Sequence, residues 1–574
     1  MHRRAHHVVS LAALVALAAA VPLVVDLAGQ QIVIQDRPMG PRTGPRDNQA
    51  PQTGTARLRG RIVGGESGQA LRRAVVRLQG QEFREGRVAS TDEEGRWEIK
   101  DLPAGRYNLT ASKGGYVQLN YGQRRPFERG RPIELADGQT LENVNFNLPR
   151  GSAITGRVTD EFGDPVADVM ISAQRYRYFG GRRRLTPVSR PASSDDGGNF
   201  RLYGLAPGDY YLSAAPMGFS FGESSGDSTG YAPTYYPGTA SAQQADKVTV
   251  AIGDEVSGLV FSLVPTRTAK ITGTAVDSRG RPMAGAFVSV IVRQGDSFSM
   301  SMGAGNQVRE DGTFTLNDVG PGEYTIQVQS LAEGPSRETA TLPIMVAGED
   351  LTGIALVGTR GTAISGRVVV EGAKSERSIQ PASVGIMAMP KEPAMEMVMY
   401  FGGESSDRLN DDWTFGIRVM TSPVLIRTTR LPPGYTLKQV VWRGQDVTDS
   451  GLTFKGDAVS DVDVVITAQS TRVTGGVLDT DGKPAADYVV VAFAEDDDKW
   501  GWLSRHRALA RPDQQGGFLI KDLPAGRYLA VALPFLEEGE EADPEVLERL
   551  RGVATPFTLA NGEQKALTLR VAEQ

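Results

Sequence analysis

The sequence contains no cysteine among its 574 residues. This absence excludes disulfide bonds, iron–sulfur clusters, zinc–thiolate sites and thiol nucleophiles. Each folded unit must therefore be stabilised by its hydrophobic core alone. A chain of this length is also too long for one core, so we expect several domains.

Histidine is almost as scarce as cysteine. Of the four histidines, three lie within the first seven residues, which leaves only His506 for the rest of the chain. Zinc-dependent hydrolysis needs a cluster of histidine or carboxylate ligands, and the residues around His506 include neither a nucleophile elbow nor an oxyanion glycine run. We therefore expect His506 to be a solvent-exposed loop or strand residue. We also expect a chain without enzymatic activity and without a cofactor.

Other classes of function have little support in the charge pattern. A glycosidase would need two facing carboxylates, and although 68 residues are acidic, nothing in the sequence places a pair together. The acidic runs at 495–499 and 537–543 are typical of solvated loops. The net charge of −6 is mild and gives no general reason to expect nucleic-acid binding.

Long apolar runs are absent except at the N-terminus, where one extends from Val8 to Val25 after Arg3 and Arg4. This order is typical of an export signal, and the run is also just long enough for an uncleaved membrane anchor. We interpret residues 1–29 as a signal peptide or an N-terminal membrane anchor, and residues 30–56 as a disordered linker. Both alternatives predict an exported protein of the periplasm, the cell envelope or the extracellular space.

What the sequence does contain is a repeated phrase. IKDLPAGRY occupies residues 99–107 and returns unchanged at 520–528, with three looser copies between them. Proline fixes φ and glycine permits φ > 0, so the phrase carries backbone geometry rather than a reactive group. We predict a corner between two strands at each copy, where a tyrosine anchors the second strand and keeps its hydroxyl near solvent. The glycines are Gly105, Gly208, Gly322, Gly434 and Gly526, and the tyrosines are Tyr107, Tyr210, Tyr324, Tyr435 and Tyr528.

Five similar blocks follow the linker. Each opens with a short alternating strand such as SAITGRVTD, continues through turns such as DEFGDPV and SDDGGNF, and closes with a final alternating strand. Short strands at this regular spacing predict an all-β fold, a tandem array of about five Greek-key β-sandwiches. The predicted repeats are repeat 1 (57–150), repeat 2 (151–266), repeat 3 (267–360), repeat 4 (361–470) and repeat 5 (471–574).

Two repeats depart from the pattern. Repeat 4 is divergent, because it lacks the Gly-x-Pro turn and carries a long insertion. Repeat 5 contains a short helix signal, in which Asp543 can cap the helix, Pro544 fits its first turn and Gly552 ends it.

The three turn motifs, G-x-P, D-x-x-G-x-F and L-P-x-G-x-Y, together resemble those of the carboxypeptidase regulatory-like domain. The resemblance covers nearly all of the chain after the linker. It implies a seven-stranded transthyretin-like (prealbumin-like) sandwich related to the collagen-adhesin B-type repeats, and an exported bacterial protein. It does not imply peptidase activity, because in carboxypeptidases the regulatory domain is separate from the catalytic one.

Aromatic residues in loops are the better candidates for binding. Exposed rings could stack on sugar rings, and the alternative is that they cover the ends of the sandwiches and pack on neighbouring repeats. Arginines beside them would also suit single-stranded nucleic acid, but an exported location argues against this. The candidate ligand-binding residues are Tyr176, Tyr178, Tyr231, Tyr235, Tyr236, Trp500 and Trp502.

Metal sites have weaker support. Met395, Met397 and Met399 alternate in repeat 4 and could hold Cu(I) on one strand face, although such methionines are more often core residues. The acidic turns lack the closing glutamate of a calcium loop, which favours turns that bond their own backbone.

Two classes of function follow from these observations. The chain is a non-catalytic envelope protein that presents aromatic loops to polysaccharide or to another envelope protein, or it is a structural spacer without a specific ligand. Repeat 1 carries 17 basic and 12 acidic residues, and repeat 5 carries 12 basic and 18 acidic residues, so their net charges are +5 and −6. We therefore also expect head-to-tail attraction between molecules as a hypothesis.

Overall fold

The computed structural model describes residues 54–80, 86–179, 182–216, 229–294, 297–301, 307–331, 337–372, 379–391, 409–420, 422–432, 434–501, 503–513 and 515–572. Within these ranges the regular secondary structure is nearly all β-strand, with one α-helix and a few short 3-10 helices, which confirms the predicted all-β class. The predicted signal or anchor and nearly all of the linker lie outside them. In the described ranges, no helix has the length and apolar character needed to cross a bilayer.

The elements of the first two repeats follow the same order. Repeat 1 contains β1 (Ala56–Gly64), β2 (Val75–Gly80), β3 (Arg87–Ser90), β4 (Arg96–Leu102), β5 (Gly105–Ser112), β6 (Leu119–Asn120), β7 (Ile133–Leu135), β8 (Thr140–Leu141) and β9 (Phe146–Leu148). Repeat 2 contains β10 (Ser152–Thr159), β11 (Val169–Phe179), β12 (Arg182–Pro187), β13 (Ala192–Ser193), β14 (Asn199–Leu205), β15 (Gly208–Pro216), β16 (Thr229–Ala232), β17 (Thr234–Tyr235), η1 (Ala242–Gln244), β18 (Lys247–Val250), β19 (Glu255–Ser262) and β20 (Val264–Arg267).

The later repeats use the same alternation of strands and turns. Repeat 3 contains β21 (Ala269–Val276), β22 (Phe287–Gln294), β23 (Ser297–Ser301), β24 (Thr313–Val319), β25 (Gly322–Gln329), β26 (Thr339–Val346) and β27 (Leu351–Val357). Repeat 4 contains β28 (Thr362–Glu371), η3 (Pro381–Ser383), β29 (Gly385–Pro390), β30 (Thr414–Val419), β31 (Val424–Arg430), β32 (Thr436–Trp442), β33 (Gln445–Asp446) and β34 (Val459–Thr467). Repeat 5 contains β35 (Arg472–Leu478), β36 (Val489–Ala494), η4 (Asp497–Lys499), β37 (Arg507–Ala510), β38 (Gly517–Lys521), β39 (Gly526–Leu533), η5 (Glu540–Ala542), α2 (Pro544–Arg551), β40 (Thr555–Leu559) and β41 (Gln564–Arg570).

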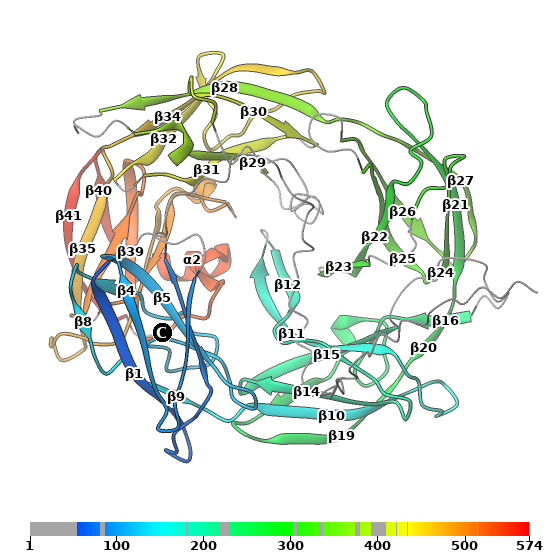
Figure 1. Ribbon diagram of the computed structural model, residues 1–574, viewed down its shortest axis with the longest axis horizontal. Helices are drawn as coiled ribbons and strands as arrows, with labels where there is room; N and C mark the ends of the chain where they lie inside the picture. The colour runs from blue at the N-terminus through cyan, green and yellow to red at the C-terminus, as the bar shows by residue number, and fades with distance from the viewer. Residues whose placement is uncertain are drawn as a thin grey trace, which may run out of the picture. The chain divides into compact units, whose positions relative to one another are not determined.

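Each repeat is built around its opening strand. In repeat 1, β1 runs antiparallel to β4 and parallel to β8 and β9 (Figure 1), while β3, β2, β5, β6 and β7 form a second sheet. The same first-sheet order returns as β14-β10-β19, β24-β21-β27 and β38-β35-β41. Repeat 4 instead has a five-stranded sheet, β30-β28-β34-β32-β33, and a small sheet of β29 and β31, so the predicted divergence of this repeat is visible in its topology.

The buried apolar residues of the described ranges gather into five clusters. Each cluster draws its buried residues from one predicted repeat, for example Ala56 to Leu148 in repeat 1 and Val473 to Leu569 in repeat 5. This is the arrangement expected when every sandwich packs its two inner faces together. The number and limits of the domains themselves stay a prediction.

A glycine within the opening strand fixes the closest approach in each sandwich. A Cβ at Gly60 would lie 1.9 Å from the backbone oxygen of Val144. The equivalent glycines of the other repeats meet the last strand in the same way: Gly156, Gly273, Gly366 and Gly475. Because a Cβ has no room there, this position requires glycine.

The predicted corner is confirmed as a passage from one sheet to the other, since β4 and β5 belong to different sheets of repeat 1. The φ angle is positive at Gly208 (149°) and Gly322 (155°), as expected. It is not positive at Gly526, where the expectation was wrong. There the Tyr528 ring lies 3.4 Å from the place of a Cβ, which is an ordinary van der Waals contact and leaves the glycine without a steric explanation.

The corner tyrosines differ from the prediction in one respect. Their rings are buried as expected, but their hydroxyls do not remain near solvent. Each hydroxyl donates a hydrogen bond to the carbonyl oxygen four residues upstream: Tyr107 to Pro103, Tyr210 to Ala206, Tyr324 to Gly320 and Tyr528 to Pro524. The tyrosine thus ties the corner to the new strand, as in the tyrosine corner of immunoglobulin-like sandwiches. In repeat 4, Tyr435 directly follows its glycine and has a different spacing.

The helix of repeat 5 is confirmed. In α2 the Asp543 side chain caps the first turn by accepting from the Glu545 N–H at 2.9 Å, and Pro544 occupies the first turn. Its apolar face, which includes Leu547, is buried on the core of repeat 5.

Candidate functional site

Three of the predicted binding residues are half-buried and already pack on other groups. On β11, the Tyr176 ring meets Tyr211 edge-on at 5.3 Å, and the Arg183 guanidinium lies 5.6 Å from its centre. Burial raises the pKa of Tyr178 above its ordinary value. Tyr231 on β16 is also half-buried, and burial, followed by the charge of Glu161, raises its pKa. These rings therefore have only part of their surface open to a ligand.

Two further predicted residues are buried, so the expected exposure is wrong for them. Tyr235 and Trp500 are each 4% exposed. Trp500 donates through Nε1 to the Ala494 carbonyl at 2.8 Å and packs edge-on against Phe493. Trp500 directly follows η4, which places its ring on Phe493 of β36, and Tyr235 lies on β17, which pairs with the core strand β15.

Of the two aromatic candidates that remain, one is half-buried and the other lies outside the described residues. Tyr236 is half-buried and packs edge-on against Phe261 at 5.6 Å. Trp502 lies outside the described residues, as do Met395, Met397 and Met399. Ligand binding by the aromatic residues stays a prediction.

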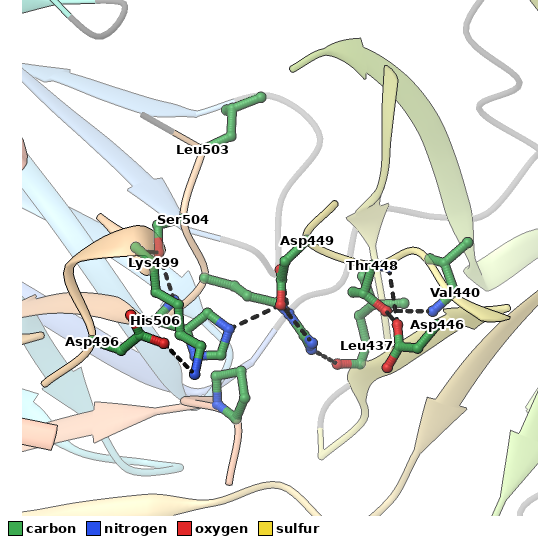
Figure 2. A network of polar contacts seen from close by, with 12 residues as sticks. Leu437, Val440, Asp446, Thr448, Asp449, Asp496, Lys499, Leu503, Ser504 and His506 are labelled. Carbon is green, nitrogen blue, oxygen red and sulfur yellow. Dashed lines mark hydrogen bonds and ion pairs between the residues drawn. The ribbon is translucent and has the colours of Figure 1, made fainter. Parts of the chain in front are cut away.

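His506 is not the exposed residue that the sequence led us to expect. It is 7% exposed and stands just before β37 at a junction of repeats 4 and 5 (Figure 2). Its Nε2 lies 2.9 Å from a carboxylate oxygen of Asp449 in repeat 4, and its Nδ1 lies 3.1 Å from the Tyr528 hydroxyl. Sequence reasoning missed this contact because Asp449 and His506 are 57 residues apart.

The junction in Figure 2 is a network around Asp449. Arg505 donates to Asp449 at 3.0 Å and to the Lys438 carbonyl at 2.9 Å, so it joins the two repeats twice. Burial acts to raise the pKa of Asp449, but the hydrogen bonds from His506 and Arg505 outweigh it and hold this pKa well below its usual range. Asp449 is therefore a charged anchor for Arg505 of repeat 5.

This junction does not have the geometry of a nucleophilic triad. The Ser504 hydroxyl donates to the Lys499 carbonyl. Both ring nitrogens of His506 face Asp449 and Tyr528 rather than Ser504. Among the described residues there is also no cluster of three or more histidine, aspartate or glutamate side chains suited to a metal ion.

A second junction joins repeat 5 to repeat 1. Arg511 and Glu128 form an ion pair in which both side chains are 2% exposed. Arg511 also donates to Asp487 at 2.8 Å. Asp487 forms further ion pairs with Arg131 at 2.5 Å and with Arg124 at 3.3 Å. The opposite charges of repeats 1 and 5 thus meet within one chain.

Repeat 2 contributes to the same region. The Arg175 guanidinium lies 3.7 Å from the centre of the Phe127 ring of repeat 1 and 3.1 Å from Glu537 of repeat 5. Backbone atoms also join these repeats, since the Glu538 N–H donates to the Phe127 carbonyl at 3.0 Å. We call the group Phe127, Glu128, Arg175, Asp487, Arg511 and Glu537 the three-repeat junction.

The aspartates of the acidic turns accept hydrogen bonds from backbone N–H groups of their own turns, as the sequence favoured over calcium binding. In the first such turn, Asp92 Oδ1 accepts from the N–H groups of Glu94 and Arg96 at 3.1 and 2.7 Å. Asp513 of repeat 5 accepts two backbone N–H groups in the same way.

Comparison with known proteins gives one family match. The carboxypeptidase regulatory-like domain matches residues 57–149, which is repeat 1. No curated protein matches the chain.

Several solved structures match this chain, all at low identity and with TM-scores of 0.20 or less. The TIE protein of Bacillus anthracis is 15% identical over 54% of this chain and 51% of its own, with a TM-score of 0.15. The minor pilin of Streptococcus agalactiae is 13% identical over 37% of this chain and 98% of its own, with a TM-score of 0.20. A streptococcal ancillary pilin is 12% identical over 53% of this chain and 99% of its own, also with a TM-score of 0.20. This chain spans about half the length of the TIE protein.

Proposed function

We propose, from the match of residues 57–149 to the carboxypeptidase regulatory-like domain, that this chain is a non-catalytic, exported protein of the cell envelope. In this proposal its β-sandwiches form a joined scaffold that presents surfaces to polysaccharide or to another envelope protein. Export rests on the apolar run from Val8 to Val25.

The observation that carries the proposal is the pairing of Arg511 with Glu128. Removing two charges from water is costly, and such a pair persists only where the geometry fixes both groups. Here the pair joins the first repeat to the last, and Asp449 with His506 likewise joins repeats 4 and 5. The buried charges thus serve the contacts between repeats, which favours a display scaffold over an enzyme.

The test measures binding and turnover together. The full chain is incubated with isolated cell-envelope material, followed by sedimentation and by assays for released reducing sugar and new amino termini. We expect co-sedimentation without released product. Product release that requires the chain would contradict the non-catalytic assignment.

The same assay tests the hairpin of β11 and β12, which we call the aromatic hairpin because β11 carries Tyr176 and Tyr178. Tyr176→Ala combined with Tyr178→Ala should weaken co-sedimentation if this hairpin binds the polysaccharide. Tyr203→Ala is the matched control, because this ring of the same repeat is 59% exposed. Equal binding by both variants would remove the hairpin from the proposal.

The alternative is a structural spacer without a ligand. It would give no binding to any envelope fraction while the contacts between repeats remain intact. A chain that fails to bind but still protects the junction amides from hydrogen exchange would favour this alternative.

A further inference from the structure

We propose that a polar cleft of repeat 1 binds neutral carbohydrate, an inference that rests on the proposed function and gives it a site. The cleft has a volume of about 350 Å³. Asn145 and Asn147, at the last strand β9, line it together with Asn120, Tyr121 and Gln123 at and after β6. The sequence did not single out any of these residues as a binding residue.

The amides lie on the outer face of the last strand. In the sequence NVNFNL the apolar residues Val144, Phe146 and Leu148 are buried in the core of repeat 1. The strand period of two therefore turns the alternate asparagines to the outside, where they are exposed. This alternation is legible in the sequence, but it is the signal of any half-buried strand.

The other repeats show that the fold does not require an amide at this strand. The parallel pairing of opening and closing strands identifies the residue equivalent to Asn147 in each repeat. These residues are Ser262, Val357, Val465 and Arg570. A serine, two valines and an arginine serve the same backbone position, so the amide of repeat 1 has no common structural reason.

Asn143, which precedes the pair, does have such a reason. Its φ is +62°, and its equivalents Gly258, Gly353 and Asp461 also have positive φ. Asparagine tolerates this conformation better than most residues. We therefore leave Asn143 out of the proposed binding group.

The two remaining asparagines have free hydrogen-bonding capacity. Asn145 Oδ1 accepts from the Arg61 N–H at 2.8 Å, which orients the side chain and leaves its NH₂ group to donate. The Asn147 side chain makes no hydrogen bond to any described residue. An amide both donates and accepts, as a sugar hydroxyl does, so the two groups are complementary.

The lining at β6 is fixed by its own hydrogen bonds. Asn120 Oδ1 accepts from the Thr110 hydroxyl at 3.1 Å, and Gln123 Oε1 accepts from the Asn120 N–H at 3.0 Å. The half-buried Tyr121 ring is held edge-on against Phe146, with centroids 6.2 Å apart. The cleft therefore combines oriented amides with an aromatic ring, which suits a ligand that has both hydroxyls and apolar C–H faces.

The charges near the cleft favour a neutral ligand. Arg124 and Arg131 both pair with Asp487, at 3.3 and 2.5 Å. Asp513 is engaged by two backbone N–H groups of its own turn. Arg124 and Arg131 share the Asp487 carboxylate, and the Asp513 carboxylate adds negative charge to the lining, so phosphate or carboxylate ligands meet no excess of cations here, whereas hydroxyl groups need none.

The experiment uses the full chain in affinity electrophoresis and calorimetry with the neutral polysaccharides dextran, laminarin and galactomannan and the anionic polysaccharide alginate. Asn147→Ala removes an amide without internal partners. Asn145→Asp keeps the acceptor for the Arg61 N–H, but it replaces the NH₂ donor by a carboxylate oxygen and adds a negative charge. Each variant should weaken binding of a neutral polysaccharide about five-fold, the effect of one net hydrogen bond.

The matched control is Ser262→Ala, at the position of repeat 2 equivalent to Asn147. We expect its affinity, and the melting temperatures of all three variants, to equal those of the parent chain. Undiminished binding by Asn145→Asp and Asn147→Ala would overturn the cleft but not carbohydrate binding elsewhere. Binding of alginate alone would overturn the ligand class. Binding of none of the four would overturn the cleft together with the polysaccharide part of the proposed function.

Discussion

The buried pair at the three-repeat junction allows a quantitative prediction. Arg511→Met leaves the Glu128 carboxylate with only the backbone N–H groups of Arg124 and Arg125, at 2.9 and 3.2 Å, and it also takes one of three arginines from Asp487. Leaving a charge buried and unpaired costs about 3–5 kcal/mol. The two repeats have separate cores, so this cost should appear as opening of the junction rather than as unfolding of a sandwich.

The Glu538 amide reports this opening, because its N–H donates to the Phe127 carbonyl across the junction. Hydrogen exchange followed by mass spectrometry measures its protection. A loss of about 3–5 kcal/mol corresponds to a protection factor lower by about two to four orders of magnitude. Amides of the repeat 5 core, such as that of Val491, should keep their protection.

Two further variants test whether the pairing is the cause. Arg511→Met combined with Glu128→Gln removes both charges, and replacing a buried pair as a whole is often nearly neutral, so protection should largely return. Arg527→Met breaks a surface pair with Glu495 in the same repeat and should leave the protection of the Glu538 amide nearly unchanged, because solvent screens exposed ion pairs. The reasoning is refuted if Arg511→Met leaves the Glu538 amide protected, or if the double variant opens as readily as the single one.

Three other predictions concern the sandwiches and the junction of repeats 4 and 5. Gly60→Ala should destabilise repeat 1 by about 1–3 kcal/mol in denaturant titrations, because the new Cβ would overlap a backbone oxygen. Gly114→Ala is the control and should be nearly neutral, because nothing lies within 4 Å of its Cβ position. Equal effects of the two substitutions would contradict the close approach of the last strand to Gly60. Tyr210→Phe should cost about 1 kcal/mol of stability at neutral pH, because it removes one hydrogen bond. Burial raises the pKa of Tyr210 to about 12, so the parent chain should lose stability as the pH rises from about 10 towards that value. The loss should be shallower in the variant. Hydrogen bonds keep the pKa of Asp449 low although burial acts to raise it, so the stability that Asp449 gives the junction is complete above the unfolded pKa of about 3.9 and is lost as the pH falls below that value. Asp449→Asn should therefore reduce the acid-induced loss of hydrogen-exchange protection at the junction. An unchanged loss would assign the acid sensitivity to other carboxylates.

Much of the fold was predictable because its signals are local. The corner phrase, the capped helix after Asp543 and the alternation of the closing strand each depend on residues close together in the chain. The destination of the Tyr107 hydroxyl was missed, although its partner Pro103 belongs to the same phrase, because the sequence does not show how far a corner folds back.

The junctions were not predictable because their partners are distant. Glu128 and Arg511 are separated by 383 residues, and each alone reads as an ordinary surface charge. Head-to-tail attraction between molecules, which we inferred from the charge difference between repeats 1 and 5, stays a prediction, and a sequence cannot distinguish contact within a chain from contact between chains. His506 was misjudged for the same reason, since its burial depends on a different repeat.

The separation of Glu128 from Arg511 also has a consequence for biosynthesis. A ribosome makes repeat 1 first, and this sandwich can close on its own core long before its counter-ion has been translated. Until then the carboxylate remains hydrated, and the desolvation that the mature contact requires is deferred to the end of synthesis. A nascent chain released before repeat 5 would consequently keep the Glu128 carboxylate hydrated and exposed, where another cationic segment could bind it.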